Sequence, residues 1–145
     1  MTRRILPELI NALLLIMWVY AAASKLFAYE DFRFQLISHK LIKNYASIVA
    51  WLVPAIELII AFLLVVPALR KQGYYLSIML LLLFSGYIIY MFNYYPHRPC
   101  SCGGIISRLS WRQHLVFNAF FILLSVAGLR MNRKSEAPAQ SRQDC

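Results

Sequence analysis

The sequence predicts an all-α integral membrane protein: a bundle of four spanning helices, with a short interfacial amphipathic helix between the first and the second. Of its 145 residues, 61% are hydrophobic and 14% charged, whereas a soluble domain is roughly 45 to 50% apolar and about a quarter charged. The mean hydropathy of +0.59 also excludes a disordered chain. Four apolar stretches each approach the roughly 20 residues that cross a bilayer.

The four spans are expected at about residues 5–28, 45–67, 73–95 and 111–130. Each must be helical, because unpaired backbone amides are not tolerated in lipid. The first span has a rival interpretation as a secretory signal, since two arginines precede it and small residues at 21–24 imitate a cleavage site. Glu8 lies early in the stretch, however, and the apolar run exceeds the 7 to 15 residues of a signal. We therefore expect the first helix to be retained within a membrane domain of residues 1–131.

Residues 29–43 mix apolar side chains such as Phe32 and Leu36 with basic ones such as Arg33 and Lys40. A helix lying along the membrane surface has this composition, although a plain connecting loop fits equally well. Residues 132–145 are rich in Ser, Gln and charge, which predicts a disordered polar tail.

The formal net charge of +9 is not distributed as in a nucleic-acid-binding protein, because the basic residues flank the apolar runs instead of forming a stripe. Four crossings place both termini on the side of the turn at Arg70. That side carries eight Lys and Arg against seven opposite, in shorter segments. The higher positive density predicts a multi-pass protein of the bacterial inner membrane with cytoplasmic termini and a periplasmic loop at residues 96–110.

That loop contains Cys100 and Cys102, separated by one residue. Their α carbons can reach the roughly 4.4 to 6.8 Å that a disulfide tolerates only with backbone strain, and strained disulfides are easily reduced. Arg98, and His97 when protonated, would favour a thiolate. The pattern favours a redox-active pair with Cys100 as the attacking sulfur, whereas Cys145 in the tail is expected to be an idle thiol.

Other interpretations of the cysteine pair remain open. A structural disulfide that closes so short a loop gains little stability. The two thiolates with His97 or His114 would suit Cu(I) or Zn, but no Met-rich or His-rich tract accompanies them, so no metal ligand is assigned. Two incidental, unpaired cysteines are the last alternative.

Glu57 lies about a dozen residues from either end of the second span, near the bilayer midplane. A carboxylate there is expected to be protonated or to face a partner in the bundle interior. Proton handling, contact with a quinone, or a neutral acid bonded between helices would each explain it. Lys25 is not expected to be the partner, because it lies roughly 15 to 20 Å away along the membrane normal.

Further candidate residues lie on the last two spans. His114 and Asn118 share a helix face, and His114 could act as a base for a thiol or a donor to a quinone carbonyl. Tyr87, Tyr90 and Tyr94 recur at helical spacing and could line a flat aromatic pocket, although packing and an interfacial aromatic belt also explain them.

These features together resemble the MauE branch of the MauE/DoxX family of redox-associated membrane proteins. The similarity covers roughly residues 5–130 and rests on the four apolar segments, on the motifs at residues 24–26 and 54–57, and on the Cys-x-Cys loop before the fourth span. Of the site residues, Cys100 and Cys102 match the family's redox pair, whereas Glu57 and His114 match by position alone.

The resemblance implies thiol-disulfide chemistry at the cell envelope, supporting disulfide formation in periplasmic partner proteins as in methylamine utilisation. The expected partners are a periplasmic thiol protein, membrane lipid and a further copy or membrane complex. By analogy with DsbB-like and VKOR-like bundles, a thiol-disulfide oxidoreductase would pass its electrons to a quinone. Those enzymes use two cysteine pairs and this chain has one. A non-enzymatic scaffold or maturation factor is therefore the alternative.

Overall fold

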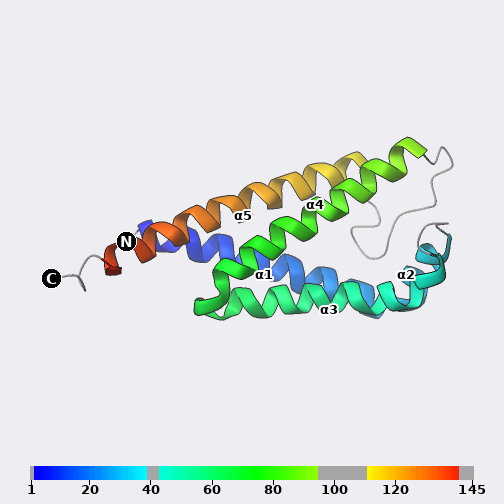
Figure 1. Cartoon of the computed structure of the whole chain (residues 1–145), viewed down its shortest axis with the longest axis horizontal. Helices are drawn as coiled ribbons and strands as arrows, with labels where there is room; N and C mark the ends of the chain where they lie inside the picture. The colour runs from blue at the N-terminus through cyan, green and yellow to red at the C-terminus, as the bar shows by residue number, and fades with distance from the viewer. Residues whose placement is uncertain (1, 39–42, 95–110, 141–145) are drawn as a thin grey trace.

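The computed structural model describes residues 2–38, 43–94 and 111–140, and within them the chain is helical and contains no strand (Figure 1). The elements in chain order are α1 Thr2–Phe27, α2 Tyr29–Ser38, the 3-10 helix η1 Lys43–Tyr45, α3 Ala46–Val65, the 3-10 helix η2 Pro67–Leu69, α4 Arg70–Tyr94 and α5 Trp111–Gln140. The expected all-α bundle with a short helix after the first span is confirmed.

Four helices are long and apolar enough to cross a membrane. Their apolar spans are Ile5–Phe27, Lys43–Val65, Pro67–Tyr90 and Arg112–Asn132. At most 39% of any span is buried inside the bundle, yet large hydrophobic side chains such as Ile16, Leu83 and Leu123 cover the exposed faces. Faces this apolar mark contact with a membrane or with another protein. The chain is accordingly a multi-pass membrane protein.

The four long helices form a ring in which α1 packs against α3 and α5, and α4 packs against the same two helices. The first turn of α1, η2 and the last turns of α5 lie at one end of the bundle, and α2 lies at the other (Figure 1). We call these the η2 end and the α2 end. The helix α4 runs toward the α2 end and α5 begins near it, so residues 95–110 join two helix ends on that side.

The helix α1 is joined to its neighbours by a polar side chain at every seventh position. Asn11 Nδ2 donates to the backbone oxygen of Leu64 at 3.1 Å, and Trp18 Nε1 donates to Ser77 Oγ at 2.9 Å. Lys25 follows seven residues later and contacts α3. A seven-residue spacing keeps side chains on one face of a helix. The polar contacts therefore fix how α1 sits against α3 and α4.

Apolar packing fills the space between these contacts. The core is built from large buried side chains of all four spans, among them Leu14, Trp18, Ile60, Leu64, Tyr74, Leu81 and Phe121. Glycines permit close approach at the η2 end: a Cβ added to Gly128 would lie 2.6 Å from Tyr74 Cε1, and one added to Gly73 would lie 3.0 Å from Leu64 Cδ2. Small residues at such contacts are characteristic of membrane helix pairs, where close packing drives association.

The short helix α2 begins where the sequence suggests, with Glu30 and Asp31 in its first turn, a favourable position for acidic groups. Phe32 and Leu36 are buried against Ala46 and Ala50 of α3. The helix form of the connection is thus confirmed over residues 29–38, whereas residues 39–42 of the expected segment lie outside the described residues.

The helix α5 continues past residue 131, where the sequence predicts the membrane domain to end. Residues 132–140 of the expected disordered tail are helical. Six of these nine residues are Arg, Lys, Glu, Ala or Gln, which favour a helix, whereas Asn132, Ser135 and Pro138 do not. The remainder of the tail, including Cys145, lies outside the described residues.

Candidate functional site

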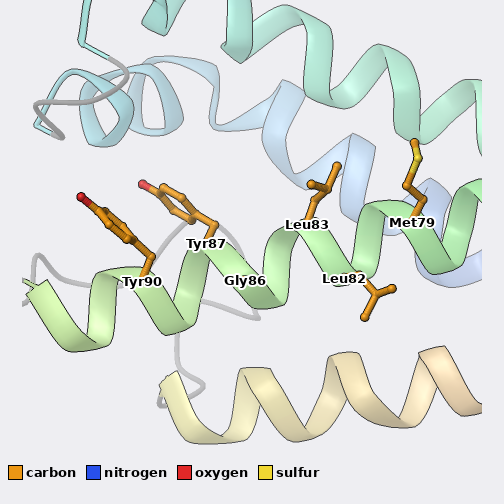
Figure 2. A pocket seen from close by; sticks show the side chains of 6 residues that line it. All are labelled: Met79, Leu82, Leu83, Gly86, Tyr87 and Tyr90. Carbon is orange, nitrogen blue, oxygen red and sulfur yellow. The ribbon is translucent and has the colours of Figure 1, made fainter.

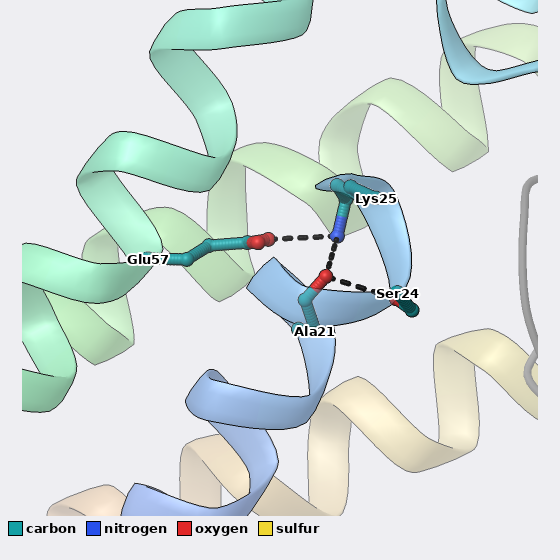
Figure 3. A network of polar contacts seen from close by, with 4 residues as sticks. All are labelled: Ala21, Ser24, Lys25 and Glu57. Atoms are coloured by element: carbon teal, nitrogen blue, oxygen red, sulfur yellow. Dashed lines mark hydrogen bonds and ion pairs between the residues drawn. The ribbon is translucent and has the colours of Figure 1, made fainter. Parts of the chain in front are cut away.

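A buried ion pair joins α1 to α3 within the bundle (Figure 3). Lys25 Nζ lies 2.8 Å from Glu57 Oε1. The Glu57 side chain is completely buried, whereas that of Lys25 is 22% exposed. An ion pair gains most when water is excluded, but removing two charges from water is also costly. Burial of this pair therefore carries a desolvation cost in free energy that an exposed ion pair would not have.

This contact overturns the expectation that Lys25 lies too far from Glu57. Lys25 is fourteen residues beyond Asn11 on α1, and Glu57 is seven before Leu64, the residue bonded to Asn11. At 1.5 Å per residue the two α carbons are offset by roughly 10 Å along the bundle. Helical side chains lean toward the N-terminus of their own helix. Because α1 and α3 are antiparallel, the two long side chains lean toward each other.

Lys25 has further partners besides the carboxylate. Its ammonium donates to the backbone oxygen of Ala21, one turn earlier, at 3.3 Å, and Ser24 Oγ donates to the same oxygen at 2.9 Å. Its Nζ also lies 6.0 Å from the ring centre of Phe32 on α2 and 5.8 Å from that of Phe84 on α4. Both distances are within the range of cation–π attraction. One ammonium therefore contacts four of the five α-helices.

Glu57 is bonded on one side only. Its Oε1 accepts from Lys25, whereas its buried Oε2 has no hydrogen-bond partner within residues 2–38, 43–94 and 111–140. Buried carboxylate oxygens are normally satisfied. An open acceptor at this depth is the least expected feature of the bundle.

His114 and Asn118 lie on α5, as predicted, but they do not bond to Glu57. Asn118 is 3% exposed, and its Nδ2 donates to Ser85 Oγ on α4 at 3.2 Å. The half-buried His114 ring packs near Phe117, with centroids 6.5 Å apart, and lies within electrostatic range of Lys25. Asn118 thus ties α4 to α5, while the ring contact of His114 is with Phe117 of its own helix.

Tyr90 borders an open hollow of about 540 Å³ along α4, together with Met79, Leu82, Leu83, Gly86 and Tyr87. Figure 2 shows the Tyr87 and Tyr90 rings projecting from the same side of α4, toward the helices α1 and α3. A Cβ added to Gly86 would meet nothing within 4 Å. Of the three tyrosines predicted to line a pocket, Tyr87 and Tyr90 border this open hollow, and an aromatic ligand there stays a hypothesis.

The remaining predicted site residues, Cys100, Cys102 and Arg98, lie outside the described residues, as does His97. The helices on either side are described: α4 ends at Tyr94 and α5 begins at Trp111. The described parts of these two helices pack along each other.

Comparison with known proteins places the chain in a family. Residues 3–131 match the family described as methylamine utilisation protein MauE. The chain belongs to the MauE family. No curated protein and no solved structure matches it. The match confirms the resemblance inferred from the motifs, and it includes Lys25, Glu57 and both cysteines of the loop.

Lys25 is the functional candidate that sequence reasoning missed. The signal was present, because the two motifs that suggested the MauE family contain Lys25 and Glu57 respectively. An acid and a base on separate spans are each costly in lipid and are expected to pair. The pairing was missed because the depth of Lys25 and Glu57 in the membrane was judged from their α carbons and not from the ends of their side chains.

Proposed function

We propose that this MauE-family protein is a membrane-embedded thiol-disulfide exchange protein that supports disulfide formation in periplasmic partners. The observation that carries the proposal is the pair Cys100 and Cys102 in the segment between α4 and α5. Sulfurs one residue apart can form only a strained disulfide, and strained disulfides are the labile, exchangeable ones. The family's description as methylamine utilisation suggests that its partners are proteins matured for that process.

The ends of the neighbouring helices support this proposal. Residues 95–110 leave α4 and enter α5 on the side of the bundle where α2 packs against α3. We propose that a soluble partner approaches the cysteines on this side of the bundle. With the predicted orientation, this side faces the oxidising periplasm, where disulfides persist.

The chemistry requires two sulfurs and a partner. Exchange passes through a mixed disulfide between Cys100 and a cysteine of the partner. When the partner is oxidised, its second cysteine attacks this mixed disulfide and releases Cys100 as a thiol, whereas in the reverse direction Cys102 resolves it. Net oxidation of a partner dithiol transfers two electrons to the Cys100–Cys102 pair and forms the partner's disulfide. The pair returns to the oxidised state by passing these electrons to a quinone or to a second membrane protein.

Trapping of the mixed disulfide tests the proposal. In cells that express Cys102→Ser at native level, quenching of free thiols should preserve a covalent adduct between this chain and a periplasmic protein, visible on non-reducing gels and lost on reduction. Cys145→Ser is the matched control and should leave the adduct of the Cys102→Ser background unchanged. Cys100→Ser in that background should abolish it.

Two other results would replace the proposal. Absence of any adduct, together with unimpaired partner maturation in the Cys100→Ser/Cys102→Ser variant, would establish a scaffold that does not use its sulfurs. Copper or zinc that copurifies with the wild type and is lost in Cys100→Ser would establish the soft-metal alternative.

A further inference from the structure

The Lys25–Glu57 pair has properties that a purely structural ion pair does not need. One carboxylate oxygen is bonded, and the other is buried without a partner in the part of the chain that the structure describes. A pair that served only to hold α1 against α3 would be expected to satisfy both oxygens, because an unsatisfied buried acceptor loses its hydrogen bonds to water and gains none in return. The open lone pairs on Oε2 are a place where a proton can bind.

The surroundings of Lys25 allow Glu57 to be protonated without leaving the Lys25 ammonium group without favourable contacts. Lys25 Nζ already donates to the Ala21 backbone oxygen and lies within 6.0 Å of the centres of two aromatic rings. These contacts persist when Glu57 carries no charge. Because Glu57 itself is fully covered and the lysine side chain is 22% exposed, a proton that enters or leaves the pair would pass along Lys25.

We propose that Lys25 and Glu57 form an intramembrane proton-binding site that exchanges protons with water at the α2 end of the bundle. A hydronium ion gives its proton to Glu57 Oε2 and leaves as water, and the reverse step returns the carboxylate. Lys25 remains an ammonium throughout, so the charge of the pair alternates between zero and plus one. No electron is transferred, and the site does not depend on the cysteines.

Other charged groups near the site must be considered in any measurement of its proton binding. Glu57 is the only ionisable residue of α3. The neighbouring helices bring to this end of the bundle His114 and Arg112 of α5, Tyr87 and Tyr90 of α4, and Glu30, Asp31 and Arg33 of α2. On α2, Arg33 is bound to Glu30 at 3.7 Å and donates to Ser47 Oγ at 3.1 Å. A carboxyl-specific readout is therefore needed.

Infrared difference spectroscopy of the full-length protein in lipid nanodiscs supplies that readout. Spectra between about pH 5 and about pH 8, where folded proteins keep most of their stability, should contain the carbonyl stretch of a protonated carboxylic acid that changes intensity with pH. The band should shift in D₂O. It should be lost in Glu57→Gln, whose amide still accepts a hydrogen bond from Lys25.

Glu8→Gln is the matched control, because Glu8 is also ion-paired, Glu8 Oε1 lying 2.6 Å from an Arg70 nitrogen, but is 60% exposed at the opposite end. This variant should keep the band. If Glu57→Gln does not fold, Glu57→Asp should displace the band in frequency. A carboxyl band that neither change at position 57 alters, that is absent, or that is constant at every pH would overturn the proposal.

The Cys100→Ser/Cys102→Ser variant separates this proposal from the proposed function. It should retain the Glu57 band in full, because proton binding needs no sulfur. Loss of thiol exchange with the band intact would leave the proton site standing, and a missing band with normal exchange would refute the proton site alone.

Discussion

The two ends of the bundle are built differently. At the η2 end, helices are in close contact: Gly128 lies under the Tyr74 ring, and the Tyr74 hydroxyl donates to Asn11 Oδ1 at 3.4 Å. At the α2 end the corresponding region of α4 carries Gly86 beside open space, and the ion pair nearby leaves one oxygen unsatisfied. Close packing stabilises the η2 end, while the α2 end retains an open hollow. A buried atom of a charged group without a partner among the described residues occurs at both ends, Arg70 Nε at the η2 end and Glu57 Oε2 toward the α2 end.

The same contrast holds for the ion pairs. Glu8 and Arg70 pair at the η2 end with an exposed carboxylate, whereas Glu57 is fully buried. Exposed pairs contribute little to stability because water competes for both charges, but a buried charge that loses its partner is costly. Functional sites are often found where local stability has been given up, so the comparison favours the α2 end as the working end.

The largest expected effect comes from removing the ammonium of the buried pair. Lys25→Met leaves Glu57 without its partner and should lower the free energy of unfolding by about 3 kcal/mol. Reversible unfolding in mixed detergent micelles, followed by circular dichroism, measures it. Lys71→Met, which alters an exposed lysine at the η2 end, should change stability by no more than about 0.5 kcal/mol. If Lys25→Met and Lys71→Met lowered the free energy of unfolding equally, the buried ion pair would not distinguish the α2 end from the η2 end.

Alanine substitutions at Gly128 and Gly86 compare how tightly the helices pack at the two ends of the bundle. Gly128→Ala places a methyl group 2.6 Å from a Tyr74 ring atom and should cost about 1 to 3 kcal/mol, since Tyr74 is only 2% exposed and cannot move aside easily. Gly86→Ala should stabilise by about 0.5 to 1 kcal/mol, because alanine favours the helix and meets no neighbour. The same unfolding assay distinguishes the signs. Destabilisation by both would show that the hollow at Gly86 is filled.

The smallest expected effect is at the exposed ion pair. Glu8→Gln should lower the free energy of unfolding by less than about 1 kcal/mol, and raising the salt concentration should reduce the difference further, because exposed charges are screened. The comparison is made with the wild type at low and high salt. A loss as large as that of Lys25→Met would mean that the η2 end also depends on a critical charge.

The spans could be predicted, because bilayer thickness imposes the length of an apolar run and the absence of water imposes helicity. The short helix after the first span was expected from its mixed apolar and basic composition, which fitted a plain loop equally well. The same reasoning about the bilayer predicted that Glu57 must be neutral or paired. It failed to find Lys25, because depth counted along one helix says nothing of how far a long side chain leans or how a neighbouring helix is offset. Composition also did not predict that the helix α5 continues to Gln140, because a polar composition alone does not determine whether a helix ends.

The sequence by itself determined the number of spans, their helical form, the motifs of the MauE family and the presence of two sulfurs in the segment before the last span. Only the tertiary structure decided that Lys25 pairs with Glu57 and that Ser85 Oγ accepts a hydrogen bond from Asn118. It also decided that Glu57 Oε2 has no hydrogen-bond partner among the described residues. The physical reason is that burial in lipid acts on each segment separately, whereas pairing of side chains depends on the relative offset and direction of two antiparallel helices.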